Sequence, residues 1–308
     1  MYLYLPVALT SINLLIPVGL GLTVGLLSGL FGVGGGFLLT PLLIMFGIPS
    51  TVAAATDSNQ IVAASTSGTY AHWKVGNVDF KMGLYLLVGG FIGGVIGVQA
   101  IQLLHAMGNA DFLIKITYIL MLGIVGTYMF IESLQSMRKK KDTSVEEVKE
   151  EKESVVGRFL KSLPLQTRFE KSGITHSVFV PIVLGVFVGI LAAIMGVGGG
   201  FLLVPVMVYM LRMPMHVVVG TSLFQILFTC IEVTFLQAYT NHSVDFILAV
   251  LLLLGSTIGA QIGTTYGRKL KAEQLKILLA VIVLVVTVKI VFEVTLTPSL
   301  LLSQVGGH

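Results

Sequence analysis

Two glycine-rich segments contain the residues whose types and spacing best suit the binding of a small ion. The sequence GVGGGFLLTP at residues 32–41 recurs as GVGGGFLLVP at residues 196–205. Each glycine costs about 1 kcal/mol relative to alanine in a helix, so we expect the helix to break in both segments. The helix that follows each break would present free N–H donors and the positive end of its dipole, which bind anions. The residues assigned to this anion site are Gly34, Gly35, Gly36, Phe37, Gly198, Gly199, Gly200 and Phe201.

A short polar cluster follows each glycine segment at nearly the same distance. Residues 56–60 have the sequence TDSNQ and residues 221–225 the sequence TSLFQ, and both interrupt apolar segments. Their second and fifth positions have capping-box spacing, so a helix that restarts after a kink is one interpretation. The other interpretation is that these side chains are hydrogen-bond donors that line a polar cavity, and the two interpretations are compatible. The side chains assigned to the cavity are Thr56, Ser58, Asn59, Gln60, Thr221, Ser222 and Gln225.

Asp57 and Glu232 are carboxylic acids inside segments that are otherwise apolar. An ionised group in the bilayer interior is costly, so such residues usually serve a function or pair with another group. A carboxylate is a poor direct ligand for an anion. We therefore assign proton coupling to both residues as the functional hypothesis, and hydrogen bonding between helices as the structural alternative.

The other reactive residue types argue against several classes of protein. Cys230 is the only cysteine, so neither a cysteine metal cluster nor an internal disulfide can form. Residues 32–36 lack the third glycine of a dinucleotide fingerprint, and no phosphate-binding Gly-Lys-Ser/Thr motif follows. The formal charge of +4 does not indicate nucleic acid. We predict no enzymatic activity, no metal or cofactor and no nucleic-acid partner.

The composition predicts that a lipid bilayer surrounds these residues. Apolar residues make up 55% of the 308 residues and charged residues only 11%, whereas soluble domains carry about 25% charged residues. The mean hydropathy is +0.94. Residues 80–104 and 246–266 are each long enough for a transmembrane helix, which needs about 20 residues. We predict an all-α polytopic membrane protein without a removable signal peptide.

The chain consists of two copies of one unit, each with five helical segments. The match includes a glycine ladder, formed by Gly89, Gly93, Gly97 and by Gly255, Gly259, Gly263. The first copy has segments at 12–31, 37–46, 52–71, 80–104 and 112–137. The second has segments at 178–195, 201–211, 217–239, 246–266 and 272–294. We place the first membrane repeat at 10–137, a charged loop at 138–177 and the second membrane repeat at 178–296, with short or broken helices at the glycine motifs.

The positions of Lys and Arg predict that the two repeats are inverted. Lys74 and Lys81 flank the loop after the third segment, but the equivalent residues 241–245 include no Lys or Arg. Conversely, residues 268–276 include Arg268, Lys269, Lys271 and Lys276, whereas the equivalent residues 102–110 contain no Lys or Arg. Because basic loops stay on the cytoplasmic side, equivalent loops should lie on opposite sides. The loop at 138–177, rich in Lys and Arg, should be cytoplasmic, which fits a multi-pass protein of the cytoplasmic membrane.

The paired glycine motif, each copy followed by a proline and then a Thr-Asp or Thr-Ser pair, resembles the TauE/SafE sulfite exporter family. The resemblance covers nearly the whole chain, from about residue 13 to 295. It implies a secondary transporter for sulfur-containing anions such as sulfite, sulfoacetate or other sulfonates. It maps this function onto Gly34–Gly36 and Gly198–Gly200, and onto the clusters at Thr56 and Thr221. Leu223 and Phe224 stand where the first repeat has Ser58 and Asn59, so we expect one polar wall only.

Inverted repeats with broken helices are typical of transporters that bind their substrate near the midplane, between the repeats. We therefore expect transport of a small anion by alternating access, with proton coupling as an option. A passive anion channel and a carrier for a different small solute remain the alternatives. Dependence of the flux on a proton gradient, together with counterflow, would separate a carrier from a channel.

Overall fold

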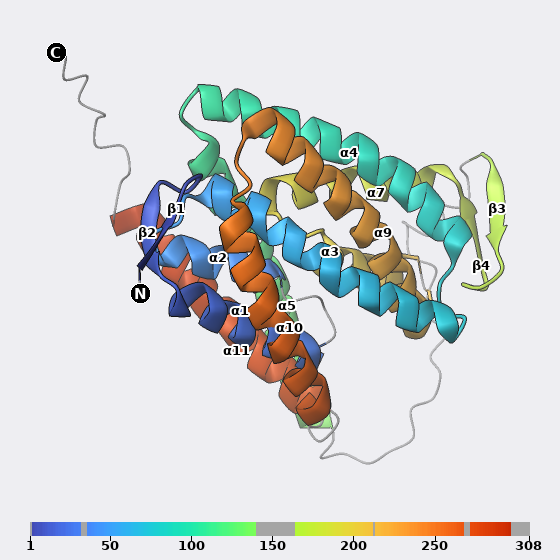
Figure 1. Cartoon of the computed structure of the whole chain (residues 1–308). Coiled ribbons are helices and arrows are strands. Elements are labelled where there is room, and N and C mark those ends of the chain that lie inside the picture. The colour runs from blue at the N-terminus through green and yellow to red at the C-terminus, as the bar shows by residue number, and fades with distance from the viewer. Residues whose placement is uncertain (1, 32–35, 140–163, 212, 268–271, 297–308) are drawn as a thin grey trace.

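The computed structural model describes residues 2–31, 36–139, 164–211, 213–267 and 272–296. Helices dominate, as predicted, and each predicted segment corresponds to one helical stretch (Figure 1). The first repeat contains α1 (Leu15–Phe31), α2 (Gly36–Met45), α3 (Ser50–Lys74), α4 (Phe80–Ala106) and α5 (Ala110–Lys139). The second contains α7 (Phe179–Met195), α8 (Gly200–Pro205), the π-helix η1 (Val206–Met210), α9 (Met215–Leu236), the π-helix η2 (Gln237–Asn241), α10 (Phe246–Gly267) and α11 (Ala272–Leu296).

The helices have the lengths and surfaces of a membrane protein. Within the described residues, four helical stretches are long and apolar enough to cross a bilayer: Phe80–Ala106, Ala110–Tyr128, Met215–Asn241 and Phe246–Gly263. Large apolar side chains such as Leu120, Ile124 and Val285 are exposed on the outer surface. Continuous helices satisfy their own backbone groups, which a hydrocarbon environment requires. This confirms the predicted all-α polytopic class.

Two β-hairpins that the sequence did not predict precede the two sets of helices. The strands β1 (Tyr2–Leu5) and β2 (Thr10–Asn13) pair antiparallel, and so do β3 (Gln166–Phe169) and β4 (Ile174–Ser177). The hairpins lie at opposite ends of the molecule (Figure 1). Strands of four residues are too short for an alternating pattern to stand out beside long apolar runs. Each structural unit therefore begins with a hairpin and continues into a long helix, α1 or α7.

The two repeats are interlocked, because the first helix of each packs on the fourth helix of the other. Helix α1 packs on α10, and α7 packs on α4. The ladder glycines permit these contacts, since a Cβ at Gly89 or Gly93 would overlap a backbone carbonyl of α7. A Cβ at Gly255 or Gly259 would overlap a carbonyl of α1 in the same way. The glycine ladder therefore serves close helix packing, as expected for small residues between membrane helices.

Equivalent helices of the two repeats run in opposite directions where they meet. Gly68 of α3 faces Leu223 of α9, whereas His72, one turn later on α3, faces the earlier residue Gly220. The same reversal relates α5 and α11, because Gly123 faces Thr287 and Gly126 faces Val283. Helices α3 and α9 cross the middle of the molecule (Figure 1) and pack on each other. The polar clusters of the two repeats are thus placed on neighbouring antiparallel helices.

Candidate functional site

The buried hydrogen bond between Thr40 and Asp57 is the centre of the candidate site. Thr40 Oγ1 on α2 donates to Asp57 Oδ2 on α3 at 2.8 Å, and both residues are fully buried. The same α2 begins at Gly36, where a Cβ would stand 3.4 Å from Asp57 Oδ2 and collide with Ile61. The start of α2 therefore lies beside the carboxyl group. Asp57 Oδ1 is buried and has no hydrogen-bond partner among the described residues.

The predicted helix break is present in the second glycine segment. Helix α7 ends at Met195 and α8 begins at Gly200, with φ near +70° at Gly196, Gly198 and Gly199. Residues that carry a side chain rarely adopt this left-handed backbone conformation. Space is also limited, because a Cβ at Gly198 would lie 2.8 Å from Cys230 Sγ. Backbone geometry and packing both require these glycines. In the first segment, Gly34 and Gly35 lie outside the described residues.

Two hydroxyl groups from the first repeat bind the end of α7 at this break. Ser58 Oγ on α3 donates to the carbonyl oxygen of Gly196 at 3.2 Å. Tyr118 on α5 is fully buried, and its hydroxyl donates to the carbonyl oxygen of Met195. The last carbonyls of a helix lack partners within the helix, so these bonds satisfy groups that the break leaves free. Tyr118 was not predicted from the sequence, although a buried tyrosine usually needs a partner for its hydroxyl.

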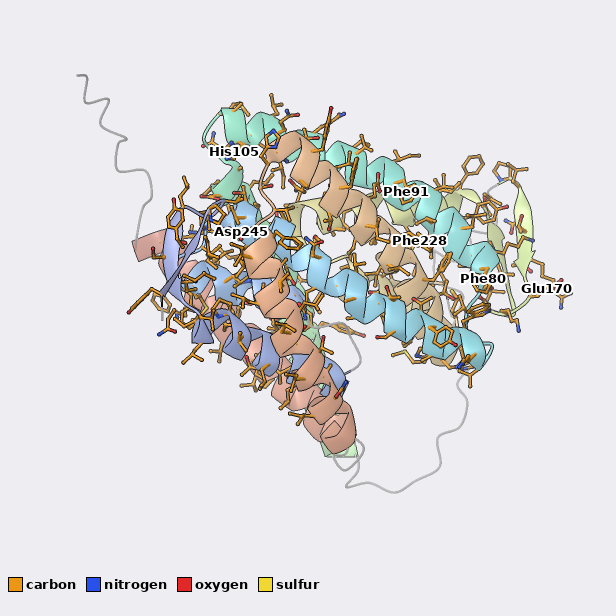
Figure 2. The ribbon with its side chains drawn as sticks, viewed as in Figure 1. Phe80, Phe91, His105, Glu170, Phe228 and Asp245 are labelled. Atoms are coloured by element: carbon orange, nitrogen blue, oxygen red, sulfur yellow. The ribbon has the colours of Figure 1, made fainter. Side chains whose placement is uncertain are left out.

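The threonines of the two polar clusters bind the start of a helix in the other repeat. The backbone N–H of Asp245 donates to Thr56 Oγ1 at 3.1 Å, and that of Asp79 donates to Thr221 Oγ1 at 3.0 Å. Figure 2 labels Asp245 where α10 begins, next to α3. Both threonine hydroxyls therefore serve contacts between the repeats in this conformation.

The same two aspartates also cap their own helices and bind a hairpin of the opposite repeat. Asp79 Oδ1 accepts the N–H of Met82, the third residue of α4, at 3.0 Å. Asp79 Oδ2 accepts the N–H and the hydroxyl of Ser172, in the β3–β4 turn, at 3.2 and 2.5 Å. Asp245 does the same at α10, where its two carboxyl oxygens accept the N–H groups of Leu248 and Val7 at 3.1 Å. The sequence analysis did not predict this role for Asp79 and Asp245.

The kink interpretation of the polar clusters is wrong, because α3 and α9 are continuous through them. Helix α3 starts at Ser50 and α9 at Met215, so neither Asp57 nor Ser222 begins a helix. Ser222 Oγ instead donates to the carbonyl oxygen of Val219 at 3.1 Å, on its own helix. The helices that do begin close to this region are α2 and α8, as the glycine motifs predicted.

The predicted side chains divide into two groups on neighbouring helices. Gly36 and Phe37 on α2 and Thr56, Ser58 and Gln60 on α3 are buried, and Asn59 on α3 is half-buried. Thr221, Ser222 and Gln225 are buried on α9, and Gly198, Gly199 and Gly200 form the break next to it. Phe201 lies in α8, and its side chain is outside the described part of the structure. Glu232, also on α9, faces Gly94 of α4 rather than α2.

Oxygen acceptors without partners distinguish this region from an ordinary apolar core. Asp57 Oδ1, Gln60 Oε1 and Gln225 Oε1 are buried and lack a hydrogen-bond partner among the described residues. Buried polar groups normally have partners, so exceptions need an explanation such as a ligand, an ion or water. In the described parts of the chain, no three His, Cys, Asp or Glu side chains are grouped to hold a metal ion. The arrangement suits a small solute with hydrogen-bonding capacity.

Comparison with known proteins identifies the family. The profile of the family described as Sulfite exporter TauE/SafE matches residues 18–290. The chain belongs to this family. It is 29% identical to the "Probable membrane transporter protein YjnA" of Bacillus subtilis, over 88% of this chain and 97% of that protein. It is 24% identical to the "Probable membrane transporter protein YunE" of the same organism, over 91% and 98% of the two chains. No solved structure gives a significant match.

A more distant relative within the family has a more specific name. The Arabidopsis thaliana "Sulfite exporter TauE/SafE family protein 2" is 30% identical over 34% of this chain and 24% of that protein. Family membership and the apolar helices together make this chain a multi-pass membrane transporter, for which the cell membrane is the usual location. The resemblance derived from the two glycine motifs is therefore confirmed. The family match spans both repeats, including both glycine segments and both polar clusters.

Proposed function

We propose that this family member is a secondary transporter that moves a small sulfur-containing anion, such as sulfite, sulfoacetate or another sulfonate, by alternating access. The observation that carries the proposal is the buried polar cluster of Thr40, Asp57, Ser58 and Gln60 beside a helix break. Fully buried polar side chains in a membrane protein usually mark a substrate or ion pathway. The family name supports a sulfur oxyanion as the class of substrate.

The proposed anion site lies between the starts of α2 and α8 and the polar faces of α3 and α9. The first N–H groups of a helix lack partners within the helix and attract anions. The proposed donors are the N–H groups of the two glycine segments, namely those of Gly34, Gly35, Gly36 and Phe37 in the first and of Gly198, Gly199, Gly200 and Phe201 in the second. The side chains proposed to complete the site are Thr56, Ser58, Asn59, Gln60, Thr221, Ser222 and Gln225.

The proposed transport cycle exchanges the structural bonds of the site for bonds to substrate. The hydroxyl groups of Ser58, Thr56 and Thr221 bind backbone groups in the present conformation. Because these bonds join the two repeats, relative movement of the repeats would release the hydroxyl groups. Discontinuous helices at a repeat interface are used in this way by transporters with inverted repeats.

We propose further that the axis relating the repeats lies in the membrane plane, so that the repeats are inverted. The opposite directions of α3 and α9, and of α5 and α11, support this arrangement. The charge distribution supports it as well. Lys81 Nζ donates to the carbonyl oxygen of Arg168 at 3.1 Å, so two basic segments lie at the same end of the molecule. Both segments belong on the cytoplasmic side by the positive-inside rule.

Asp57 is proposed to carry a proton together with the anion. An ionised carboxylate next to an anion, in a site without bulk water, would repel it strongly. Protonation of Asp57 removes this repulsion, and the protonated oxygen would also add a hydrogen-bond donor to the site. Proton and anion would then move in the same direction.

The test measures binding first and transport second. The purified protein is heated in detergent with sulfite, sulfoacetate, sulfate or acetate at two pH values, and the unfolding midpoint is recorded. We expect stabilisation by a sulfur oxyanion and none by acetate, because ligands that bind only the folded state stabilise it. Thr40→Val should weaken this stabilisation, whereas Gly19→Ala, on the open side of α1, should retain it. Equal stabilisation by acetate, or none by any sulfur oxyanion together with no flux into proteoliposomes, would contradict the proposed substrate class.

A further inference from the structure

We infer that a second site, formed by Gln225, Thr229 and Glu232 of α9 against Gly90 and Gly94 of α4, binds a small monovalent cation, either a proton or Na⁺. The inference rests on the proposed function, because a coupling cation has a role only in a transporter driven by a gradient. It places the cation where α9 packs on α4, and not beside Asp57, which is bonded to Thr40 of α2. In this inference the side chain of Gln225 would bind the cation as well as border the proposed anion site.

The three side chains form one polar stripe on the face of α9 that packs on α4. Gln225, Thr229 and Glu232 are spaced by four and three residues, so consecutive members are neighbours on one helix face. Gln225 and Thr229 are both fully buried, and Gln225 Nε2 donates to Thr229 Oγ1 at 2.8 Å. This bond leaves Gln225 Oε1 without a partner among the described residues, and the buried Glu232 Oε2 has none there either. The stripe therefore offers acceptor oxygens.

The glycines of α4 leave space for this stripe. A Cβ at Gly90 would lie 2.7 Å from Thr229 Oγ1 and 2.9 Å from Gln225 Nε2. A Cβ at Gly94 would lie 2.9 Å from Glu232 Oε2. All three distances are shorter than ordinary contacts of a methyl group. Each polar side chain of the stripe thus approaches the backbone of α4 directly, where carbonyl oxygens are also present.

Comparison of the two repeats shows that the fold alone does not demand these glycines. The ladder glycines Gly89 and Gly93 recur as Gly255 and Gly259, because both sets pack on a backbone. Gly90 and Gly94 instead correspond to Ser256 and Ala260, at the same offset along the sequence. A side chain is therefore accommodated at these positions in the other repeat. The equivalent stripe on α3 has Ser67 where α9 has Glu232, so the acidic site occurs once.

The donor set indicates the class of ligand. Hard oxygen ligands suit protons and hard metal ions, and not soft transition metals. One carboxylate balances one positive charge, whereas Ca²⁺ and Mg²⁺ sites usually contain several oxygen ligands, with more than one carboxylate. A monovalent cation would neutralise Glu232, and Gln225 and Thr229 offer further oxygen atoms on the same face of α9. Carboxyl groups inside a helical bundle commonly mark ion pathways and proton relays in membrane proteins.

The other titratable groups on the helices that pack against α9 leave Glu232 as the carboxylate of this site. Helix α4 carries Lys81 and Tyr85 near its start and His105 near its end, all more than two turns from Gly94. Helix α3 carries Asp57, which binds Thr40, and has Tyr70, His72 and Lys74 in its last turns. The helices α7 and α8 have no titratable side chain. Tyr239, on η2, is exposed and stacks on Phe235, and the side chain of Tyr209, on η1, lies outside the described part of the structure. Cys230, on α9 itself, faces Gly198.

The experiment measures a cation response that needs no anion. The unfolding midpoint of the purified full-length protein is recorded while Na⁺ replaces choline at fixed pH, and again over a pH series in choline. The wild type and Glu232→Gln are compared. A sodium response that the variant loses identifies Na⁺, and a pH response that differs between the two proteins identifies the proton. Identical responses of both proteins in both series would overturn the inference.

A second variant keeps the test decisive if Glu232→Gln does not fold. Gly94→Ala should reduce the cation response by occupying the space beside Glu232, whereas Gly19→Ala, with no atom near its Cβ position, should preserve it. A wild-type response in Gly94→Ala would count against the site. Failure of the proposed function has a different signature, because the cation response would persist while no sulfur anion binds or moves.

Discussion

The side chain of Thr56 and the backbone N–H of Asp245 are hydrogen-bonded across the repeat interface at 3.1 Å, and Thr221 and Asp79 form the corresponding bond at 3.0 Å. The two bonds are equivalent, with the roles of the repeats exchanged. Each connects α3 or α9 to the capped start of a long helix, α10 or α4, in the opposite repeat. The chain is therefore held together by a matched pair of contacts at the two ends of the α3–α9 pair.

Thr56→Val and Thr221→Val should destabilise the protein by similar amounts. Each change leaves a buried backbone N–H without its partner, which costs about 1–3 kcal/mol. Reversible unfolding in mixed micelles would measure the loss. Thr23→Val, on the exposed face of α1, is the matched control and should have little effect, because its hydroxyl binds only carbonyls of its own helix. A large difference between the two buried variants would contradict their structural equivalence.

Gly93→Ala should destabilise the packing of α4 on α7. The new methyl group would overlap the carbonyl oxygen of Val186, and overpacking of this kind costs about 1–3 kcal/mol. Gly19→Ala is the control, because no atom lies within 4 Å of its Cβ position. It should be neutral or stabilising by up to about 1 kcal/mol, since alanine favours the helix. Equal unfolding midpoints for the two variants would show that the ladder contact is looser than the structure indicates.

Gly199→Val and Gly35→Val should abolish transport in protein that still inserts into the membrane. Gly199 has a φ of +70° and lies against Val188, and the left-handed conformation costs about 1–2 kcal/mol for a residue with a side chain. The valine would also fill the space at the start of α8. Flux of labelled sulfite into proteoliposomes, normalised to inserted protein, is the measurement. Normal flux through Gly199→Val would restrict the glycines to a packing role.

Cysteines placed at Asn109 and Lys271 should react with a membrane-impermeant reagent from opposite sides of the membrane. The two positions lie in equivalent loops, between α4 and α5 and between α10 and α11, and inverted repeats place such loops on opposite faces. Cys230 is buried and is replaced by alanine in both variants to remove background. Labelling in right-side-out and inside-out vesicles distinguishes the sides. Reaction of both cysteines from one side would exclude the inverted arrangement.

The sequence alone determined the approximate limits of the helical segments, the duplication and the resemblance to the family. These features depend on local apolar runs and on glycine motifs, which are visible without any knowledge of contacts. The break at Gly196–Gly200 was predictable for the same reason, since consecutive glycines weaken a helix wherever it lies. The short hairpins were not predictable, because four alternating residues give a weak signal.

Only the tertiary structure decided which groups meet. Thr40 and Asp57 are close in the sequence, but they form a hydrogen bond only because α2 packs on α3. Tyr118, in the first repeat, donates a hydrogen bond to the carbonyl oxygen of Met195, in the second. Likewise, the sequence assigned Thr56 and Thr221 to a polar cavity, and the structure shows that their hydroxyl groups bind backbone groups of the opposite repeat in this conformation. The partner of a hydroxyl depends on how helices cross. Crossing positions are set by the packing of distant glycines on distant backbones, and a pattern along one chain does not contain that information.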